Sequence, residues 1–360
     1  MDSILEANLM DKLEMFYNLL CFIFGVPMNL ITLKWLLGRK RVTSSLLHIH
    51  LNISDLAVLF FYCFARFCWL VTYEWKAGQM TCKAMRFAES LSFSISSNIL
   101  VSIAVNRYCA LKHPIQVTIN CNSFRECSTV HWEERVTALA SFSWIFAVSF
   151  SLPQLFVWDV YNLDGNYTQC LNIWVKAKAE LLFVEGHGFG NFSSDLEYLD
   201  NMVRLYEMYH LLVVFWIPLI VLICLYALII REMYSSMALG ADVNNGAVRP
   251  SFRFPSVPTA QLRRNSRNVK VLKRARWKAL RITLILMTTY TLCWLPYNSL
   301  ALWGVIDPGS YIEHENTVYI MHSLVVLNSV INPCIYGSTF RRAVCAHRRK
   351  PLIFNSVPVR

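Results

Sequence analysis

The chain has 360 residues, of which 55% are hydrophobic and only 16% charged, with a formal net charge of +11. Its mean hydropathy is positive. This composition excludes an ordinary soluble enzyme of the same length and favours a protein that crosses a membrane several times.

Seven apolar stretches are each long enough to cross a bilayer as a helix, which takes roughly 20 residues. They cover residues 14–37, 46–72, 83–105, 136–157, 207–230, 279–303 and 317–337. Most carry only scattered polar residues, whereas a helix of a soluble domain has one polar face. The sequence therefore predicts an all-α membrane protein, a seven-transmembrane helix bundle over residues 14–337.

Lys and Arg collect after the first predicted span (39–41), between the fifth and sixth (263–278) and after the seventh (341–350). By the positive-inside rule these segments are cytosolic. We therefore expect an extracellular N-terminus (1–13) and a cytosolic C-terminal segment (338–360). Membrane lipid and a cytosolic partner account for the net charge, so no nucleic acid is needed to explain it.

The C-terminal segment alternates basic and apolar residues from Gly337 to Arg349. This pattern predicts a short amphipathic helix on the membrane surface, followed by a tail. Cys345 within it is a candidate palmitoylation site.

The stretch 158–205 is the largest loop on the predicted outer side. It contains two matches to the N-glycosylation pattern, at Asn166 and Asn191. Cys170 lies in this loop and Cys82 at the outer start of span three, both on the oxidising side of the membrane. We expect a disulfide between them that holds the loop over the bundle; the alternative is two free thiols.

Span three carries an unusual number of hydroxyl side chains for a helix facing lipid, so we expect it at the centre of the bundle. They are Ser90, Ser92, Ser94, Ser96 and Ser97, followed by Asn98. Arg107 follows Cys82 by 25 residues, roughly 37 Å along a helix. Arg107 should therefore emerge at the cytosolic face.

Landmarks in all seven spans, taken together, resemble those of rhodopsin-like (class A) G-protein-coupled receptors. They are Asn29, Leu51-Asn52-Ile53-Ser54-Asp55-Leu56, Cys82, Asn106-Arg107-Tyr108, Trp144, Pro218, Tyr226, Cys293-Trp294-Leu295-Pro296 and Asn332-Pro333-Cys334-Ile335-Tyr336. The resemblance covers residues 14–345 and implies a plasma-membrane receptor that has no enzymatic activity.

The resemblance also implies roles for polar residues inside the spans. The residues that the resemblance assigns to G-protein coupling and to switching between states are Asn106, Arg107, Tyr108, Tyr226 and Tyr336. An unpaired carboxylate in mid-span is costly, so Asp55 needs partners, and the resemblance implies an allosteric sodium ion there; the alternative is a purely structural hydrogen-bond cluster. The expected site is Asp55, Ser96, Asn328, Ser329 and Asn332. No other metal or cofactor is expected.

The chain departs from the family pattern at several positions. Asn106 replaces the acid that usually precedes the Arg, and Arg276 stands where an acid is often found. Arg107 therefore lacks both of the ion pairs, one with the preceding residue and one with the inner end of span six, that restrain the corresponding arginine in the family's inactive state. Ser97 and Tyr290 replace the usual Ile and Phe, which leaves the coupling of span six open.

The ligand class is narrowed by three positions. No lysine lies near Val326, which excludes an opsin, and Glu89 replaces the Asp of amine receptors. Arg66 and Glu89 should both face the outer cavity, where they pair with each other or bind charged groups of a ligand.

The run HLNISDLAVLFF, with Cys68-Trp69, Trp75, Gly78, Cys82-Lys83 and Cys293 to Tyr297, resembles the receptors for gonadotropin-releasing hormone, adipokinetic hormone and vasopressin/oxytocin. This implies a neuropeptide ligand. The expected ligand contacts are Arg66, Glu89, Trp174, His210, Trp294, Tyr297, Asn298 and His322.

We therefore predict a neuropeptide receptor that signals through a heterotrimeric G protein by opening of the cytosolic end of span six, with arrestin as a further candidate partner. Two alternatives remain from the sequence. One is an orphan receptor with a non-peptide ligand or altered coupling, and the other is a polytopic transporter.

Overall fold

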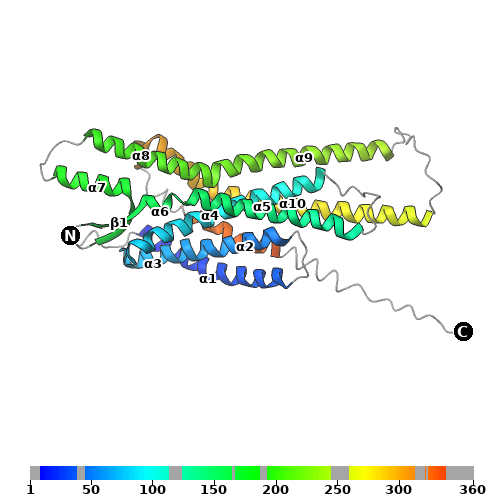
Figure 1. Cartoon of the computed structure of the whole chain (residues 1–360), viewed down its shortest axis with the longest axis horizontal. Coiled ribbons are helices and arrows are strands. Elements are labelled where there is room, and N and C mark those ends of the chain that lie inside the picture. Colours follow the sequence, from blue (N-terminus) through cyan, green and yellow to red (C-terminus); the bar gives the residue numbers. More distant parts are fainter. Residues whose placement is uncertain are drawn as a thin grey trace.

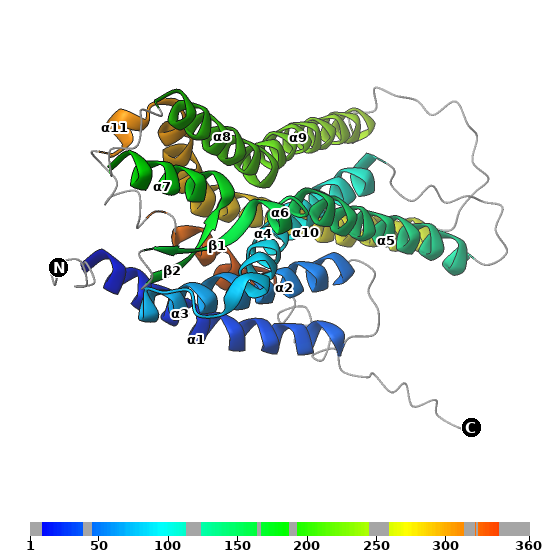
Figure 2. The ribbon, with the colours of Figure 1, turned by 60° about the vertical axis from the view of Figure 1, so that its left-hand side comes forward.

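The computed structural model describes residues 9–38, 45–112, 124–163, 167–186, 193–244, 259–312, 321 and 323–337. Its helices run along the long axis of the molecule and form a bundle (Figures 1 and 2). The predicted amphipathic helix and tail at 338–360, with Cys345, lie outside these residues.

The first four predicted spans lie in helices that are straight or interrupted once. These are α1 (Leu9–Leu37), the run α2 (Leu46–Val58), η3 (Leu59–Phe64) and α3 (Ala65–Thr72), then α4 (Gly78–Lys112), and α5 (Phe124–Ser151) with the short α6 (Gln154–Val157). Pro153 separates α5 from α6 because proline has no amide hydrogen to continue a helix.

The remaining spans follow a small extramembrane layer. This layer consists of β1 (Trp158–Leu163), β2 (Tyr167–Asn172) and α7 (Ile173–Gly186). The fifth span is α8 (Ser193–Leu211), η4 (Leu212–Trp216) and α9 (Ile217–Asn244), and the sixth is α10 (Thr259–Ile306), followed by α11 (Pro308–Ile312). The helix Ser323–Gly337 is the described part of the seventh.

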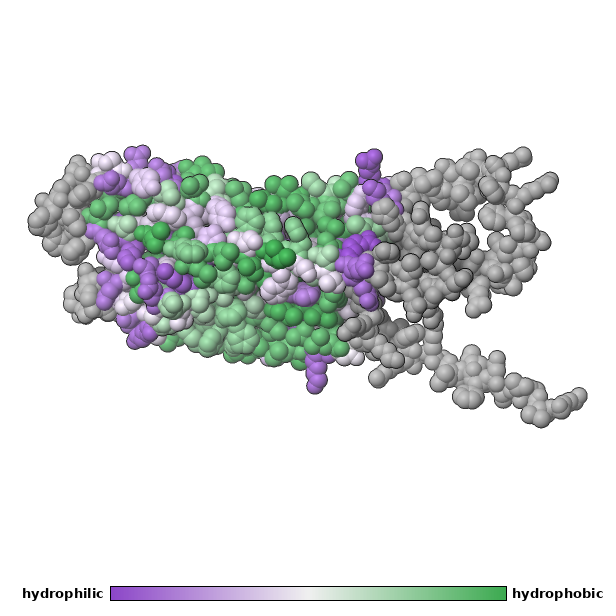
Figure 3. Space-filling model, in the orientation of Figure 1, coloured by the Kyte–Doolittle hydropathy of each residue, from purple (hydrophilic) through white to green (hydrophobic). Residues whose placement is uncertain are grey.

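On the face shown in Figure 3, apolar side chains form a belt over most of the middle of the bundle, and hydrophilic side chains gather on either side of it. Large apolar residues of the predicted spans, such as Phe24, Phe142 and Ile220, are exposed. Within the described residues, five helical segments are long and apolar enough to cross a membrane, and Ser323–Gly337 is a shorter apolar helix. Exposed apolar side chains are stable in a bilayer, so the belt marks the membrane-spanning part.

Several helices extend further than the apolar stretches predicted. Helix α1 begins at Leu9 rather than at 14, and α8 begins at Ser193 rather than at 207. The helix of the fifth span continues past residue 230 to Asn244, and that of the sixth begins at Thr259 rather than at 279. Hydropathy identifies only the part of a helix that lies in lipid. The helical backbone can continue into water where neighbouring segments of the protein pack against it. Helix α8 is supported by α7, where Lys178 Nζ and Asp200 Oδ1 lie 2.5 Å apart.

Helix α4 occupies the centre of the bundle, as its hydroxyl side chains predicted. It packs against α2, α5, α9 and α10, and all five of its serines from Ser90 to Ser97 are buried. Contacts to α5 include hydrogen bonds between Ser102 and Ser143 at 2.8 Å and between Ser151 and Ser90 at 3.2 Å.

Two short π-helices, η3 and η4, interrupt the second and fifth spans. A π turn accommodates an extra residue, so residues beyond it are rotated by about 100° relative to an uninterrupted α-helix. Helix η4 ends two residues before Pro218, whose missing amide hydrogen favours such an irregular turn.

We call the part of the bundle that carries β1, β2 and α7 the hairpin end. The part where α4 ends at Lys112, α9 ends at Asn244 and α10 begins at Thr259 is the opposite end (Figure 1).

Candidate ligand cavity and switch residues

A cavity of about 410 Å³ opens between the helices at the hairpin end. Residues from η3, α3, α4, α6, β1, β2, α8, α10 and α11 enclose it. They are Tyr62, Arg66, Arg86, Glu89, Ser90, Gln154, Trp158, Asn172, Tyr206, Glu207, His210, Leu211, Tyr297, Ala301, Gly304 and Tyr311. A wall with this many polar groups is suited to a polar ligand rather than a lipid.

The β1–β2 hairpin lies beside the cavity and is anchored by a disulfide. Cys82 on α4 and Cys170 on β2 are bonded, with their Cα atoms 5.8 Å apart, so the predicted bridge is confirmed. Trp69 Nε1 also donates to Gln169 Oε1 at 3.0 Å. These links hold Asn172 and Trp158 at the cavity wall.

A surface network joins the hairpin to its neighbours. Asp159 accepts hydrogen bonds from Lys176 Nζ at 2.9 Å and from Gln79 Nε2 at 2.6 Å. The bond from Lys176 lowers the pKa of Asp159 below its ordinary value, and the same contact raises the pKa of Lys176. The pair therefore stays charged throughout the neutral range.

The two charged residues expected in the cavity, Arg66 and Glu89, both line it, but they do not pair with each other, which was one of the two alternatives left by the sequence. Arg66 binds Glu14 of α1 through two hydrogen bonds of 2.9 and 3.0 Å, and Glu89 binds Arg86 at 3.0 Å. In an uninterrupted α-helix, the 11 residues from Asp55 to Arg66 would make about three turns and place both side chains on one face. Helix η3 interrupts that count and turns Arg66 toward α1.

The other predicted ligand residues lie at different depths. His210 and Tyr297 line the cavity. Trp174 packs against the lining residue Tyr206, with ring centroids 5.5 Å apart. Asn298 is buried and donates to the carbonyl of Trp294 at 2.8 Å. His322 lies outside the described residues.

Sequence reasoning missed several lining residues, above all Arg86, Tyr206 and Glu207. Arg86 precedes Glu89 by three residues, a spacing that brings two side chains together on a helix. Glu207 precedes His210 by the same interval, so the shared face of α8 could have been found. Both residues lie within the apolar stretch 207–230, but hydropathy does not show toward which neighbour that face of the helix points.

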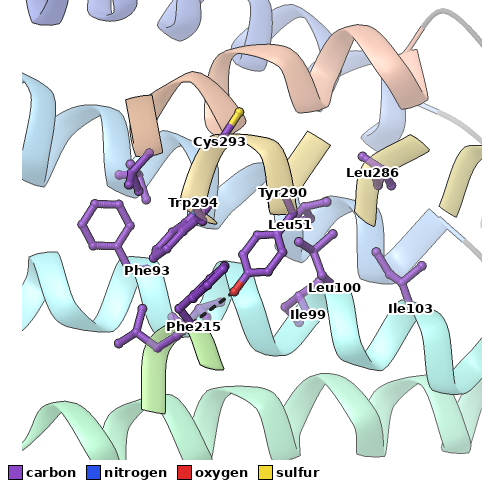
Figure 4. Close-up of a cluster of buried hydrophobic side chains, with 14 of the residues drawn as sticks. Leu51, Phe93, Ile99, Leu100, Ile103, Phe215, Leu286, Tyr290, Cys293 and Trp294 are labelled. Atoms are coloured by element: carbon purple, nitrogen blue, oxygen red, sulfur yellow. Dashed lines mark hydrogen bonds between the residues drawn. The ribbon is translucent and has the colours of Figure 1, made fainter. Parts of the chain in front are cut away.

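Trp294 lies below the cavity in a cluster of aromatic rings (Figure 4). Its ring is 5.2 Å from Phe93, perpendicular to it, and 5.5 Å from Tyr290. Phe93 is in turn 5.4 Å from the lining residue Tyr62. A continuous path of packed rings therefore leads from the cavity wall to α10.

The substitutions Ser97 and Tyr290 form a polar contact where the family pattern has an apolar one. The hydroxyl of Tyr290 lies 3.2 Å from Ser97 Oγ and 3.3 Å from the carbonyl oxygen of Val214. Ser97 Oγ donates to the carbonyl of Phe93 at 3.2 Å and so can accept from Tyr290. Tyr290 therefore connects α10 to α4 and to η4.

The buried carboxylate Asp55 is held by Asn332, whose Nδ2 donates to both carboxylate oxygens at 3.1 and 3.2 Å. Ser96, Asn328 and Ser329 are buried as well. Side-chain oxygens of Ser96, Asn328 and Asn332 are enclosed without a hydrogen-bond partner. Oxygen atoms are the ligands that hard cations prefer, so these residues fit a small cation.

A second polar network fixes Tyr336. Asn52 Nδ2 donates to the hydroxyl of Tyr336 at 2.9 Å and to Asn29 Oδ1 at 2.7 Å. Asn29 in turn donates to the carbonyl of Ser329 at 3.0 Å. Tyr336 is thus directed into the bundle between α1 and α2.

Arg107 lies near the opposite end, where α4, α9 and α10 meet. It interacts electrostatically with Tyr226, which lies beside Thr283. Arg107 forms no ion pair or hydrogen bond within the described part of the chain, and its Nε is enclosed. Asn106 Oδ1 is also buried without a partner. The ring of Tyr108 lies 5.7 Å from Lys112 Nζ.

The glycosylation candidates Asn166 and Asn191 lie outside the described residues. The segments 39–44 and 338–360, which hold the basic clusters after the first and seventh spans, lie outside them too.

Comparison with known proteins gives a consistent result. The family described as 7 transmembrane receptor (rhodopsin family) matches residues 28–336. The chain is 30% identical over 390 residues to the G-protein coupled receptor daf-38 of Caenorhabditis elegans, covering 92% of this chain and 89% of that protein.

Two vasopressin receptors are more distant. The chain is 24% identical to the vasopressin V1b receptor of Mus musculus, covering 83% of this chain and 65% of that protein. It is 27% identical to the vasopressin V2 receptor of Bos taurus, covering 80% of this chain and 67% of that protein.

Proposed function

The chain belongs to the rhodopsin family of seven-transmembrane receptors, and on this premise we propose that it is a receptor for an extracellular peptide that signals through heterotrimeric G proteins. The family makes it a multi-pass protein of the plasma membrane and not an enzyme. The predicted seven-transmembrane bundle is confirmed, and the transporter alternative is set aside.

The observation that carries the proposal is the polar cavity of about 410 Å³ at the hairpin end. By the positive-inside rule, the basic segments 39–41, 263–278 and 341–350 of the sequence support a cytosolic opposite end and a cavity that opens to the outside. Relatives whose names assign them vasopressin, a peptide hormone, support a peptide ligand.

Transmission from the cavity to α10 follows the packed rings. A ligand that displaces Tyr62 would change the support of Phe93 and hence of Trp294. Pro296 lies inside α10 and has no amide hydrogen to donate to the carbonyl of Leu292, which lies between Tyr290 and Trp294. The helix is therefore weakened at this turn, which can act as a hinge. Release of Tyr290 from Ser97 and Val214 would then free α10 to move outward near Arg107 and Tyr226, where the G protein would bind.

We further propose that a sodium ion binds at Asp55, with oxygen atoms from Ser96, Asn328, Ser329 and Asn332. The ion would neutralise the buried carboxylate and stabilise one packing of the bundle. Thermal unfolding of the purified receptor in sodium chloride and in choline chloride tests this. Sodium should raise the unfolding temperature, and Asp55→Asn should abolish the difference.

The receptor proposal is tested by expressing the chain with promiscuous G proteins and screening a library of neuropeptides. Arg107→Ala serves as the comparison, because it removes the cation at the proposed docking surface. Activation by a peptide that Arg107→Ala abolishes at equal surface expression is the expected result. Silence across the screen together with unchanged basal signalling in Arg107→Ala would contradict coupling.

A second candidate is an orphan receptor with a non-peptide ligand or altered coupling. It is favoured by Asn106, which cannot form an ion pair with Arg107, and by the polar contact between Ser97 and Tyr290. High basal signalling that no peptide changes would support this alternative.

A further inference from the structure

The cationic side chains of the cavity wall all have acidic partners, whereas one of its carboxylates has no cationic partner in the described part of the chain. Both arginines of the wall are held by carboxylates of the protein. Arg66 is clamped by two oxygens of Glu14. Arg86 binds Glu89 at 3.0 Å, and its guanidinium lies 4.3 Å from the ring centroid of Trp158. Arginines fixed in this way have little capacity left for a ligand anion.

Glu207 is different. It is an exposed residue that lines the cavity, and it has no ion pair or hydrogen bond within the ranges that the structure describes. Its carboxylate is close enough to Tyr297 to interact electrostatically. With two arginines matched by Glu14 and Glu89, Glu207 leaves the cavity with an excess of one negative charge.

Aromatic rings share the cavity with this unpaired charge. Four tyrosines line the same cavity: Tyr62, Tyr206, Tyr297 and Tyr311. Ring faces attract cations, and they do so more strongly when the site is shielded from water. A carboxylate among tyrosines is therefore chemically suited to a guanidinium or ammonium group.

We propose that Glu207 binds a cationic group of the ligand, so that the peptide taken by this receptor is basic, with an arginine, a lysine or its N-terminal ammonium group in the cavity. The inference rests on the proposed function. A planar guanidinium would form two parallel hydrogen bonds with the carboxylate. An anionic ligand is disfavoured because it would meet Glu207 and would have to displace Glu14 or Glu89.

The charge of the cavity can be measured without knowing the ligand. Ala301 lines the cavity on α10, and Ala301→Cys introduces a thiol as a reporter. The thiol is reacted with a cationic reagent, trimethylammonium-ethyl methanethiosulfonate, and with an anionic one, sulfonatoethyl methanethiosulfonate. The ratio of the two rates reports the local electrostatic potential, after the rates of the chain without the reporter are subtracted. We expect Glu207→Gln to lower the ratio of cationic to anionic rates roughly tenfold, the size expected for one charge acting across a cavity.

Glu197→Gln is the matched control, because Glu197 is exposed on the same helix but does not line the cavity. It should leave the ratio within about twofold, since charges at the surface are screened. An equal effect of the two substitutions, or no effect of Glu207→Gln, would overturn the proposal whether or not a peptide is known.

The second arm uses peptides that activate the receptor in the screen, each paired with a version in which arginine is replaced by the neutral isostere citrulline. The arginine form should be preferred at least tenfold, and Glu207→Gln at equal surface expression should remove that preference. If peptides activate the receptor but the preference is absent or survives the substitution, the inference fails while the proposed function stands. If no peptide activates, the proposed function fails and the rate ratio alone decides.

Discussion

The two ends of the bundle balance their charges differently. At the hairpin end Arg66 and Arg86 are each held by a carboxylate, and a disulfide fixes the adjoining strand. At the opposite end Arg107 follows Asn106 and has no acidic partner in the described residues. A cavity that must bind one ligand benefits from fixed side chains. A region that must rearrange benefits from weak restraint, because a small bias then shifts the population of states.

The largest expected effect comes from breaking a pair at the hairpin end. Glu14 is 2% exposed and Arg66 20%, so Glu14→Ala removes two charge-assisted hydrogen bonds from a largely buried arginine. We expect a loss of about 3 kcal/mol in the free energy of unfolding. Thermal unfolding of the purified receptor in detergent measures it.

The exposed pair of Lys76 and Glu74, at 3.4 Å, provides the control. Glu74→Ala should cost less than about 1 kcal/mol, since surface pairs are screened by water and salt. Adding Arg66→Leu to Glu14→Ala should recover part of the loss. Equal effects of Glu14→Ala and Glu74→Ala would remove the contrast drawn between the two ends.

The next effect tests the connection between the ends. Tyr290→Phe removes the hydroxyl that contacts Ser97 and Val214. The loss of about 1 kcal/mol per hydrogen bond should loosen α10 and raise basal signalling roughly fivefold at equal surface expression.

Thr288→Val is the matched control, because the Thr288 hydroxyl bonds only the carbonyl of Leu284 on the same exposed helix face. It should leave basal signalling unchanged. A Tyr290→Phe receptor with the native basal level would show that this contact does not restrain α10.

A smaller effect follows from giving the opposite end the pairing that the hairpin end has. Asn106→Asp places a carboxylate beside Arg107 and should lower basal signalling, by a factor that corresponds to less than about 1 kcal/mol. Basal inositol phosphate and cyclic AMP levels measure it. If basal signalling is already nil and the substitution changes nothing, the missing acid does not determine the resting state.

The smallest effect concerns the surface network of the hairpin. The folded pKa of Asp159 is below its ordinary 3.8 and that of Lys176 above its ordinary 10.5. The pair therefore contributes its full stability between the two ordinary pKa values, 3.8 and 10.5. This contribution is lost as the pH falls through the folded pKa of Asp159, and also as the pH rises through the folded pKa of Lys176.

Between about pH 5 and pH 9, Asp159→Asn should accordingly lower the unfolding temperature by a small and constant amount. A difference between native and Asp159→Asn that varies within this range would mean that another titrating group controls the hairpin.

Most of the architecture was predictable because lipid imposes a strong and local requirement on sequence. A span needs a long apolar stretch with internally satisfied backbone bonds, so all seven spans could be located. The disulfide between Cys82 and Cys170 followed from topology, since both cysteines face the oxidising side. The central place of α4 followed from its buried hydroxyl groups.

The partners of the charged residues could not be predicted from spacing along the chain. Helix η3 shifts Arg66 toward Glu14, and no proline or glycine within Leu59–Phe64 marks that interruption. Glu207 is the first residue of the apolar stretch 207–230, and hydropathy does not give the direction in which a side chain at the end of a span points. The contact of Tyr290 with Ser97 and Val214 joins residues 193 and 76 positions apart.

The sequence by itself thus determined which segments lie in the membrane, because that depends on the composition of each segment alone. The tertiary structure decided which charges are neutralised and which one, Glu207, is left for a ligand. Side-chain pairing depends on the rotation of each helix about its axis, and that rotation is set by packing against neighbours that are distant in the chain.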